Sequence, residues 1–219
     1  MICDHMPGSF KILSISDIPI PFIYSPHVRQ LFSDVSLVIC CGDLPYAYSE
    51  YVLNRLGKPL FFVHGNHDPP FENSNSGRRI GPNGGLDLHR RVIAHQGILL
   101  AGVEGSHRYR PGGFQYSQAE MWYHALSLVP GLLYNRMLYG RFLDILVTHA
   151  PPRGIHDQDD QAHQGIAAFR WLDRVFQPGF HFHGHVHIYR PDATTQTMLG
   201  RTHVINTYGF RVTVMKDTE

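Results

Sequence analysis

Short apolar runs recur along this chain, and a polar side chain follows most of them. Runs of this kind, rich in β-branched residues and without alternation, predict strands that are buried on both faces. Six such strands are expected, at Lys11–Ser16, Leu37–Cys41, Pro59–Val63, Ile98–Val103, Leu143–Thr148 and Phe180–His183. Strands of this type require a fold in which each sheet is covered on both sides.

Helical patterns lie between these strands, and the alternation of strand and helix is typical of an α/β fold. Helices are expected at about Pro26–Ser33, Ser49–Leu56, Ser117–Leu138 and Ile166–Phe176. Pro130 and Gly131 are expected to break or kink the third helix. The segment Thr202–Met215 alternates and contains Gly209, which predicts a hairpin or a pair of strands that switch sheets.

The organisation along the chain is simple. The 219 residues contain no internal repeat and no linker, so we expect one domain that spans residues 1–219. The stretch Glu72–Gly85 is polar and predicts a long loop, which in a compact domain is often functional.

Charge, hydropathy and cysteine content exclude several classes of protein. The net charge is +1 without a basic cluster, which argues against nucleic-acid binding. No apolar run reaches the roughly 18–20 residues that span a bilayer, and the N-terminus lacks the features of a secretory signal. The three cysteines form no disulfide framework, which predicts a cytoplasmic protein. No feature of the sequence sets the oligomeric state.

A carboxylate, an amide or an imidazole follows each of five predicted strands. In open α/β sheets the ligand crevice lies outside the carboxyl ends of the strands, so these side chains are expected at one rim. Mixed nitrogen and oxygen ligands without thiolate suit Mn, Fe, Zn, Co or Ni better than Ca, and disfavour a structural zinc site. The side chains are Asp17, Asp43, Asn66, His67, Asp68, His149, His185 and His187.

The order of these motifs resembles that of the calcineurin-like metallophosphoesterase family. The resemblance covers residues 17–187 and rests on Asp17, Gly42-Asp43, Gly65-Asn66-His67-Asp68, Thr148-His149 and Gly184-His185-Val186-His187. It implies a two-sheet β-sandwich flanked by helices in four layers, with a dinuclear metal centre of Mn, Fe or Zn at the strand ends. It also implies a hydrolase that acts on a small-molecule phosphoester. A phosphomonoester, a phosphodiester and a cyclic nucleotide all remain open as substrates.

The resemblance also implies a ligand set for two ions. One ion would be bound by Asp43, Asn66, His149 and His185. The other would be bound by Asp17, His187 and a second oxygen of Asp43. Two ions about 3.5–4 Å apart form the clamp used for in-line displacement at phosphorus, with a metal-bound water or hydroxide as the nucleophile.

Other residues are assigned to the substrate. By the same resemblance, His67 protonates the leaving oxygen or stabilises the phosphoryl charge, and Asp68 holds the His67 ring. Asn66 also faces the substrate. Arg108 or Arg110, in the segment after the strand Ile98–Val103, could clamp a phosphate bidentately, and Arg108 is the one assigned to substrate binding.

The first motif departs from the family pattern. The family has Asp-x-His, whereas this chain has Asp17-Ile18-Pro19. Because proline cannot ligate through its side chain, the Asp17 site keeps three protein ligands from the matched positions. Water or a histidine from elsewhere would complete it, and His27 is one candidate.

Three alternatives stay open. The polar loop 153–165 either faces the substrate beside His149 or is a solvated loop that precedes the helix starting near Ile166. The whole protein could also be a scaffold with the same fold, because Pro19 is one step toward loss of the metal centre. The third possibility is a mononuclear metal-binding protein that uses only Asn66, His149 and His185.

Overall fold

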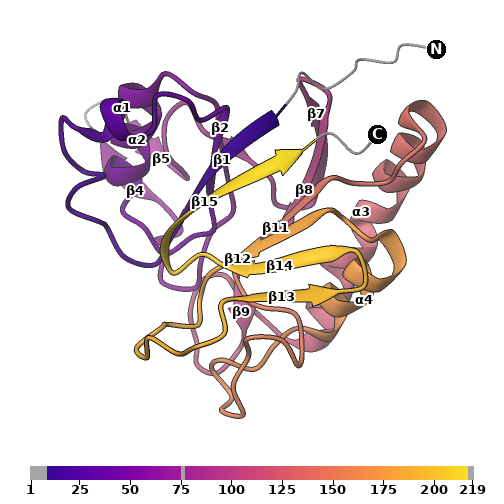
Figure 1. Cartoon of the computed structure of the whole chain (residues 1–219). Coiled ribbons are helices and arrows are strands. Elements are labelled where there is room, and N and C mark those ends of the chain that lie inside the picture. Colours follow the sequence, from indigo (N-terminus) through magenta and orange to yellow (C-terminus); the bar gives the residue numbers. More distant parts are fainter. Residues whose placement is uncertain (1–8, 75–76, 217–219) are drawn as a thin grey trace.

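The computed structural model of the chain describes residues 9–74 and 77–216, and its backbone forms two large sheets packed against each other (Figure 1). The first sheet has the spatial order β15-β1-β2-β3-β6. Its strands are β1 (Ser9–Ser16), β2 (Leu37–Cys40), β3 (Leu60–Phe62), β6 (Leu86–Asp87) and β15 (Gly209–Lys216). Strands β1, β2, β3 and β6 run parallel, and β15 is antiparallel to β1 at one edge.

The second sheet has the order β13-β14-β12-β11-β8-β7. Its strands are β7 (Arg91–His95), β8 (Ile98–Val103), β11 (Ile145–Thr148), β12 (Phe180–His183), β13 (Gln196–Leu199) and β14 (Thr202–Asn206). The four central strands are parallel, and the two edge strands are antiparallel to their neighbours. Two short pairs complete the strands, namely β4 (Glu72–Ser74) with β5 (Gly77–Arg79), and β9 (Ser106–His107) with β10 (Gln115–Tyr116).

Helices cover the outer face of each sheet and give the four layers that the family resemblance implies. Helices α1 (Val28–Leu31) and α2 (Tyr46–Leu56) pack on the first sheet, and α3 (Gln118–Tyr139) and α4 (Ala167–Phe176) pack on the second. Consecutive residues of β1 belong to different cores: Ile12 lies between the sheets, whereas Leu13 lies under α1 and α2. This alternation explains why successive residues of the central strands are buried, whichever face they point to.

Two sequence expectations are resolved by this architecture. Strand β14 belongs to the second sheet and β15 to the first, so the C-terminal segment switches sheets and is not a hairpin. Pro130 does not break α3, which runs through it from a Ser117–Glu120 capping box to Gly140 in the left-handed conformation. Burial of apolar side chains on both sides of Pro130 offsets the cost of about 3 kcal/mol that an interior proline brings.

The polar stretch 72–85 is not a continuous loop. Its beginning forms the β4–β5 pair. Arg79 of β5 forms one ion pair with Glu72 of β4 and a second with Glu50 of α2. These charges fix the segment on the molecule although it contains few apolar residues. Among the helices of the described residues, none is long and apolar enough to cross a membrane.

Candidate metal centre

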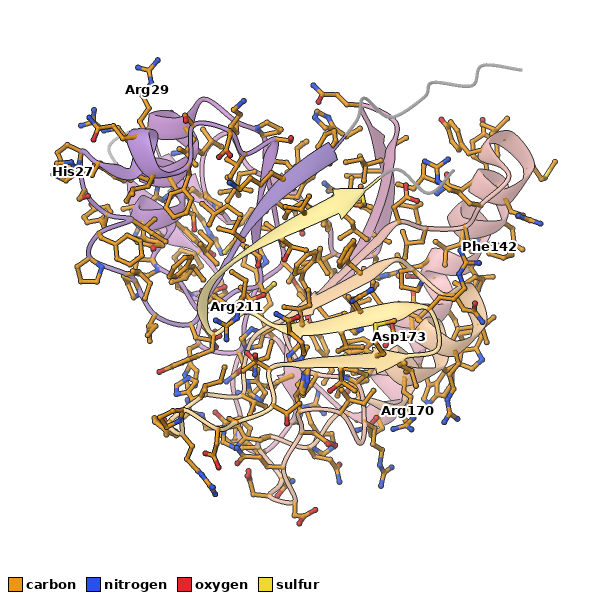
Figure 2. All side chains as sticks on the ribbon, in the orientation of Figure 1. His27, Arg29, Phe142, Arg170, Asp173 and Arg211 are labelled. Atoms are coloured by element: carbon orange, nitrogen blue, oxygen red, sulfur yellow. The ribbon has the colours of Figure 1, made fainter. Side chains whose placement is uncertain are left out.

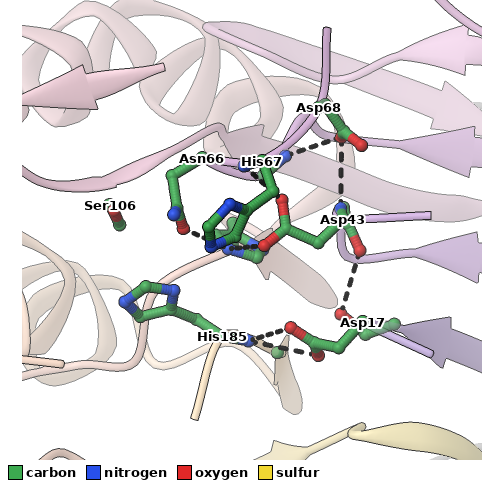
Figure 3. A network of polar contacts seen from close by, with 12 residues as sticks. Asp17, Asp43, Asn66, His67, Asp68, Ser106 and His185 are labelled. Carbon is green, nitrogen blue, oxygen red and sulfur yellow. Dashed lines mark hydrogen bonds and ion pairs between the residues drawn. The ribbon is translucent and has the colours of Figure 1, made fainter. Parts of the chain in front are cut away.

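The polar residues that follow the central strands of both sheets meet at one edge of the molecule (Figure 3). Asp17 follows β1, Asp43 lies beyond β2, and His185 lies beyond β12. The backbone of these three residues has positive φ angles of 67°, 57° and 67°. A left-handed conformation is uncommon for residues other than glycine, and it turns each side chain back toward the strand ends. Such strain is typical of functional sites.

The predicted ligands of the first ion are close together. The ligand atoms of Asp43, His149 and His185 all lie within 4.8 Å of one another. His149 Nε2 is 3.3 Å from Asp43 Oδ2 and 3.0 Å from the Oδ1 atom of Asn66. The four side chains predicted for this site therefore converge, and their nitrogen and oxygen donors suit a transition-metal ion.

Backbone carbonyls fix the rings of the two histidines. The Nδ1 atom of His149 donates to the Cys41 carbonyl at 2.7 Å, which leaves Nε2 facing Asp43. The Nε2 atom of His185 donates to the Ala162 carbonyl at 2.7 Å, so Nδ1 carries the free lone pair of a neutral ring. Histidines that bind metals are commonly oriented in this way by an acceptor on the other ring nitrogen.

The charges of this cluster compensate one another. Burial disfavours the charged form of Asp43, but the adjacent His149 lowers the pKa of the carboxyl below its ordinary value. Burial likewise opposes the charge of His149, yet the carboxylates of Asp43 and Asp17 raise its pKa above the ordinary histidine value. Burial lowers the pKa of His185 to about 3, so this ring is neutral and available as a ligand at pH 7.

The predicted ligands of the second ion lie beside the first group. The Asp17 carboxylate accepts the backbone N–H of His185 at 2.9 and 3.2 Å, and its Oδ1 atom is 3.9 Å from His187 Nε2. The Nδ1 atom of His187 lies 2.8 Å from the Tyr189 hydroxyl. Burial raises the pKa of Asp17. Asp17 and His187 are thus neighbours, and the 3.9 Å between their donor atoms falls within the spread of the first cluster.

The structure does not bring His27 to the Asp17 site. This histidine precedes α1, is exposed, and lies on the outer surface of the helix-covered face (Figure 2). Pro19 is exposed as well. The expectation that His27 fills the place of the missing histidine is therefore wrong, since the α1 segment turns away from the strand ends.

Two glycines allow the strand ends to approach. A Cβ atom on Gly65 would lie 2.1 Å from Asp43 Oδ1, and one on Gly184 would lie 2.0 Å from Ser16 Oγ and 2.6 Å from Asp17 Oδ2. No side chain fits in either place. The carboxylates of the first sheet can therefore reach the turns that carry Asn66 and His185 only because these positions are glycine.

The turn after β3 presents His67 and Asp68 differently from the expectation. Asp68 Oδ2 accepts the backbone N–H groups of Gly65 and Asp43 at 2.8 and 3.2 Å, so it holds the turn and not the His67 ring. The backbone N–H of His67 donates to Asp43 Oδ1 at 2.7 Å, and its ring is exposed. Burial raises the pKa of Asp68 to about 6.

The arginine beside His67 is Arg110 and not Arg108. An Nη2 atom of Arg110 lies 3.4 Å from His67 Nδ1. Arg108 instead donates to both carboxylate oxygens of Glu120, at 3.1 and 3.0 Å, and to a backbone carbonyl. Tyr109, between the two, accepts a hydrogen bond from the Asn66 amide at 3.3 Å. Sequence reasoning could not separate the two arginines, because both follow the same strand and only their partners differ.

The loop 153–165 lies against the candidate centre. Its Ala162 carbonyl holds the His185 ring, and the His163 ring is 5.2 Å from the His185 ring between centroids. Gln161 bonds to His107 and to the Arg108 carbonyl at 3.3 Å each. Of the two interpretations of this loop, its position agrees with the one that places it beside the site.

A buried chain of hydrogen bonds supports the turn before His149. Asp173 of α4 lies 2.9 Å from His181 Nδ1, and His181 Nε2 lies 2.8 Å from the Thr148 hydroxyl. All three side chains are buried. The sequence favours a packed or surface histidine at position 181, and the structure places His181 in this buried chain.

Comparisons with known proteins agree with the geometry. The model of the family described as calcineurin-like phosphoesterase matches residues 10–189. An uncharacterized protein of Haemophilus influenzae is 28% identical over a match of 184 residues, and the match covers 74% of this chain and 76% of the relative. Among solved structures, TT1561 of Thermus thermophilus has a TM-score of 0.61 at 14% identity and covers 94% of this chain and 98% of its own.

A second solved structure has a different described role. GAP50, the anchor in the inner membrane complex of Plasmodium, has a TM-score of 0.57 at 11% identity and covers 95% of this chain and 82% of its own. At such identities these two structures show a shared fold and nothing about activity.

Proposed function

Because the chain belongs to the calcineurin-like phosphoesterase family, we propose that it hydrolyses a small-molecule phosphoester with the help of metal ions. The observation that carries the proposal is the convergence of Asp43, His149 and His185, with the Asn66 amide 3.0 Å from His149. A carboxylate, an amide oxygen and two imidazoles have no need to converge at a strand edge in a purely structural protein, since burying them is costly.

The donor set fits a pair of transition-metal ions such as Mn, Fe or Zn. Asp43, Asn66, His149 and His185 would hold the first ion, and Asp17, Asp43 and His187 the second. When bound, the ions supply an acidified water and neutralise charge on the phosphoryl group. We propose that the second ion binds more weakly, because Pro19 contributes no ligand and the matched positions leave this ion three protein ligands.

His67 presents a hydrogen-bond donor beside the candidate centre. Its Nδ1 atom faces an Arg110 guanidinium, which can only donate, so the neutral ring carries its proton on Nε2. We propose that this Nε2–H stabilises the charge on the phosphoryl group and its leaving oxygen by a hydrogen bond. The guanidinium of Arg110 adds positive charge beside the phosphoryl oxygens, where Arg is well suited to bind. Asp68 contributes by holding the turn that carries His67.

Two other functions are to be tested against this one. The same fold occurs in an anchor protein, so a scaffold without activity is one alternative. A protein with one metal ion is another, favoured by the exposed Pro19 in the first motif. The substrate is proposed only as a phosphomonoester, a phosphodiester or a cyclic nucleotide.

The test is turnover of p-nitrophenyl phosphate and bis(p-nitrophenyl) phosphate with added Mn²⁺. The wild-type protein should hydrolyse at least one of them, and His67→Ala, which removes the Nε2–H donor, should lower kcat by roughly 100-fold or more while binding the same amount of metal. The scaffold interpretation holds instead if folded, metal-loaded wild-type protein is inactive across a phosphoester panel. One bound ion per active chain would support the mononuclear form.

A further inference from the structure

Helix α3 is apolar on two opposite faces. One face packs on the second sheet and on α4 through Met121, Ala125, Leu128 and Leu132. The opposite face, here named the outer stripe, consists of Tyr123, Leu126, Leu133, Tyr134, Met137 and Leu138, each between 49 and 84% exposed. A surface helix of a globular protein normally carries charged and polar residues on its outer face. Arg90 lies over the Tyr123 ring, 4.6 Å from its centroid, and donates to the Tyr123 hydroxyl at 3.0 Å, whereas the other five side chains of the outer stripe are about half exposed or more.

The spacing of the outer stripe is that of a helix-packing seam. Starting from Tyr123, exposed residues follow at Leu126, Pro130, Leu133 and Met137, which alternates steps of three and four. This is the period of an a/d seam in paired helices. Figure 1 shows α3 at the outside of the molecule, where the end of the helix stands clear of both sheets.

We propose that the outer stripe is a homodimer interface in which α3 of one chain packs against α3 of a second copy. No Asp, Glu, Lys or Arg is among the six residues of the outer stripe, and the Arg90 guanidinium lies over Tyr123 at one end of it. An antiparallel pairing of two copies therefore keeps the two Arg90 side chains at opposite ends of the interface. Two-fold pairing of identical patches is the commonest arrangement of oligomers. A membrane surface fits less well, because an interfacial helix turns a strongly charged face to water, whereas the other face of α3 is buried in protein.

The area agrees with a dimer. With full areas of roughly 150–250 Å² per residue, the exposed fractions of the six residues amount to about 500–900 Å² per chain. A standard stable interface buries about 800 Å² per partner. Contiguous apolar patches of this size on the surface of soluble proteins mark interaction sites.

The experiment compares oligomeric state by sedimentation equilibrium of the full chain at micromolar concentrations. The wild-type protein should have twice the mass of the chain, and the double variant Leu126→Glu, Leu133→Glu should be monomeric. Val175→Glu is the matched control, since Val175 is a similarly exposed apolar residue on α4, and it should stay dimeric. Circular dichroism checks that each variant is folded.

Cross-linking keeps the proposal testable if the double variant fails to fold. Three samples are compared in a Cys3→Ser background, namely Met137→Cys, Tyr123→Cys and a mixture of these two variants. At least one sample should form a disulfide-linked dimer, because the two helices of a two-fold seam run either parallel or antiparallel. Val175→Cys should give none. A wild-type mass of one chain at every concentration overturns the proposal, as does a dimer that persists in the folded double variant without any stripe cross-link.

Discussion

At the scale of single residues, the candidate centre depends on which nitrogen each histidine presents and on how much charge surrounds it. His149 has no exposed surface and lies between two carboxylates, which together raise its pKa above the ordinary value. His185 is the opposite case, because burial lowers its pKa to about 3. The same residue type is thus charged at one ligand position and neutral at the other before a metal binds.

The raised pKa of His149 makes metal binding release a proton. In the metal-free protein His149 keeps its proton up to and beyond neutral pH, and a metal ion must displace it. The affinity for Mn²⁺ should therefore rise with pH through the neutral range and level off only above the raised pKa. Calorimetric titration in buffers of different ionisation enthalpy measures the protons released. An affinity that does not change between about pH 6 and 9, with no proton released on binding, would contradict this assignment.

Arg110 and Arg108 give a matched pair of variants. Arg110→Gln removes the charge beside His67 and should lower kcat/KM for phosphoester substrates roughly 10- to 100-fold, as a charged hydrogen bond of about 1.5–3 kcal/mol is lost. Arg108→Gln removes a half-exposed ion pair with Glu120 and should change kcat/KM by less than about two-fold. Steady-state kinetics measures kcat/KM for both variants. A larger loss of kcat/KM for Arg108→Gln than for Arg110→Gln would assign phosphate binding to Arg108.

Residue types at strand ends could be predicted from the sequence, but their partners could not. The positions of Asp43, Asn66 and His149 follow from parallel strands that end at one edge. The partner of Arg110, in contrast, depends on the path of the segment after β8. The hydrogen bonds that Asp68 accepts from backbone amides likewise depend on the conformation of the turn, which the sequence alone does not specify.

At the scale of elements, doubly buried strands were predictable and edge strands were not. Every residue of β8 and of the stretch Ile12–Ser16 in β1 is buried, because both faces of these strands are covered. The edge strands β7 and β13 are half exposed, and their mixed composition gives no strong pattern. Helix α3 departs from the rule that an interior proline ends a helix, because packing on both sides of Pro130 outweighs the cost of the proline.

The contact between the ends of β1 and β12 gives a prediction at this scale. Gly184→Ala would place a Cβ atom 2.0 Å from Ser16 Oγ and 2.6 Å from Asp17 Oδ2, so the Asp17 carboxylate must move. The variant should lose the more weakly bound metal ion and at least about 10-fold in kcat. Metal content by mass spectrometry and the phosphoester assay measure this.

The matched control for this change is Gly113→Ala. Gly113 has no atom within 4 Å of an added Cβ and lies in an exposed loop. Its metal content and activity should equal those of the wild-type protein. If Gly184→Ala also retains both, the close approach of the two strand ends does not position the second metal site.

At the scale of the whole molecule, the candidate centre exists because two sheets close on each other. Asp17, Asp43 and Asn66 come from the first sheet, and His149, His185 and His187 come from the second. The shared core between the sheets, which includes Ile12 and Phe182, fixes their relative position. The family and its four layers could be predicted from ordered motifs, whereas activity does not follow from the fold.

The most direct test of the proposed activity is the dependence of bis(p-nitrophenyl) phosphate hydrolysis on added Mn²⁺, measured on protein stripped with a chelator. We expect no turnover without metal and turnover that rises with Mn²⁺ in two steps of unequal affinity. Asp43→Asn, which alters the carboxylate shared by both proposed ions, should abolish both steps in a folded protein. Turnover that survives complete metal removal, or its absence in folded protein saturated with Mn²⁺, would contradict the proposed metal-dependent hydrolysis.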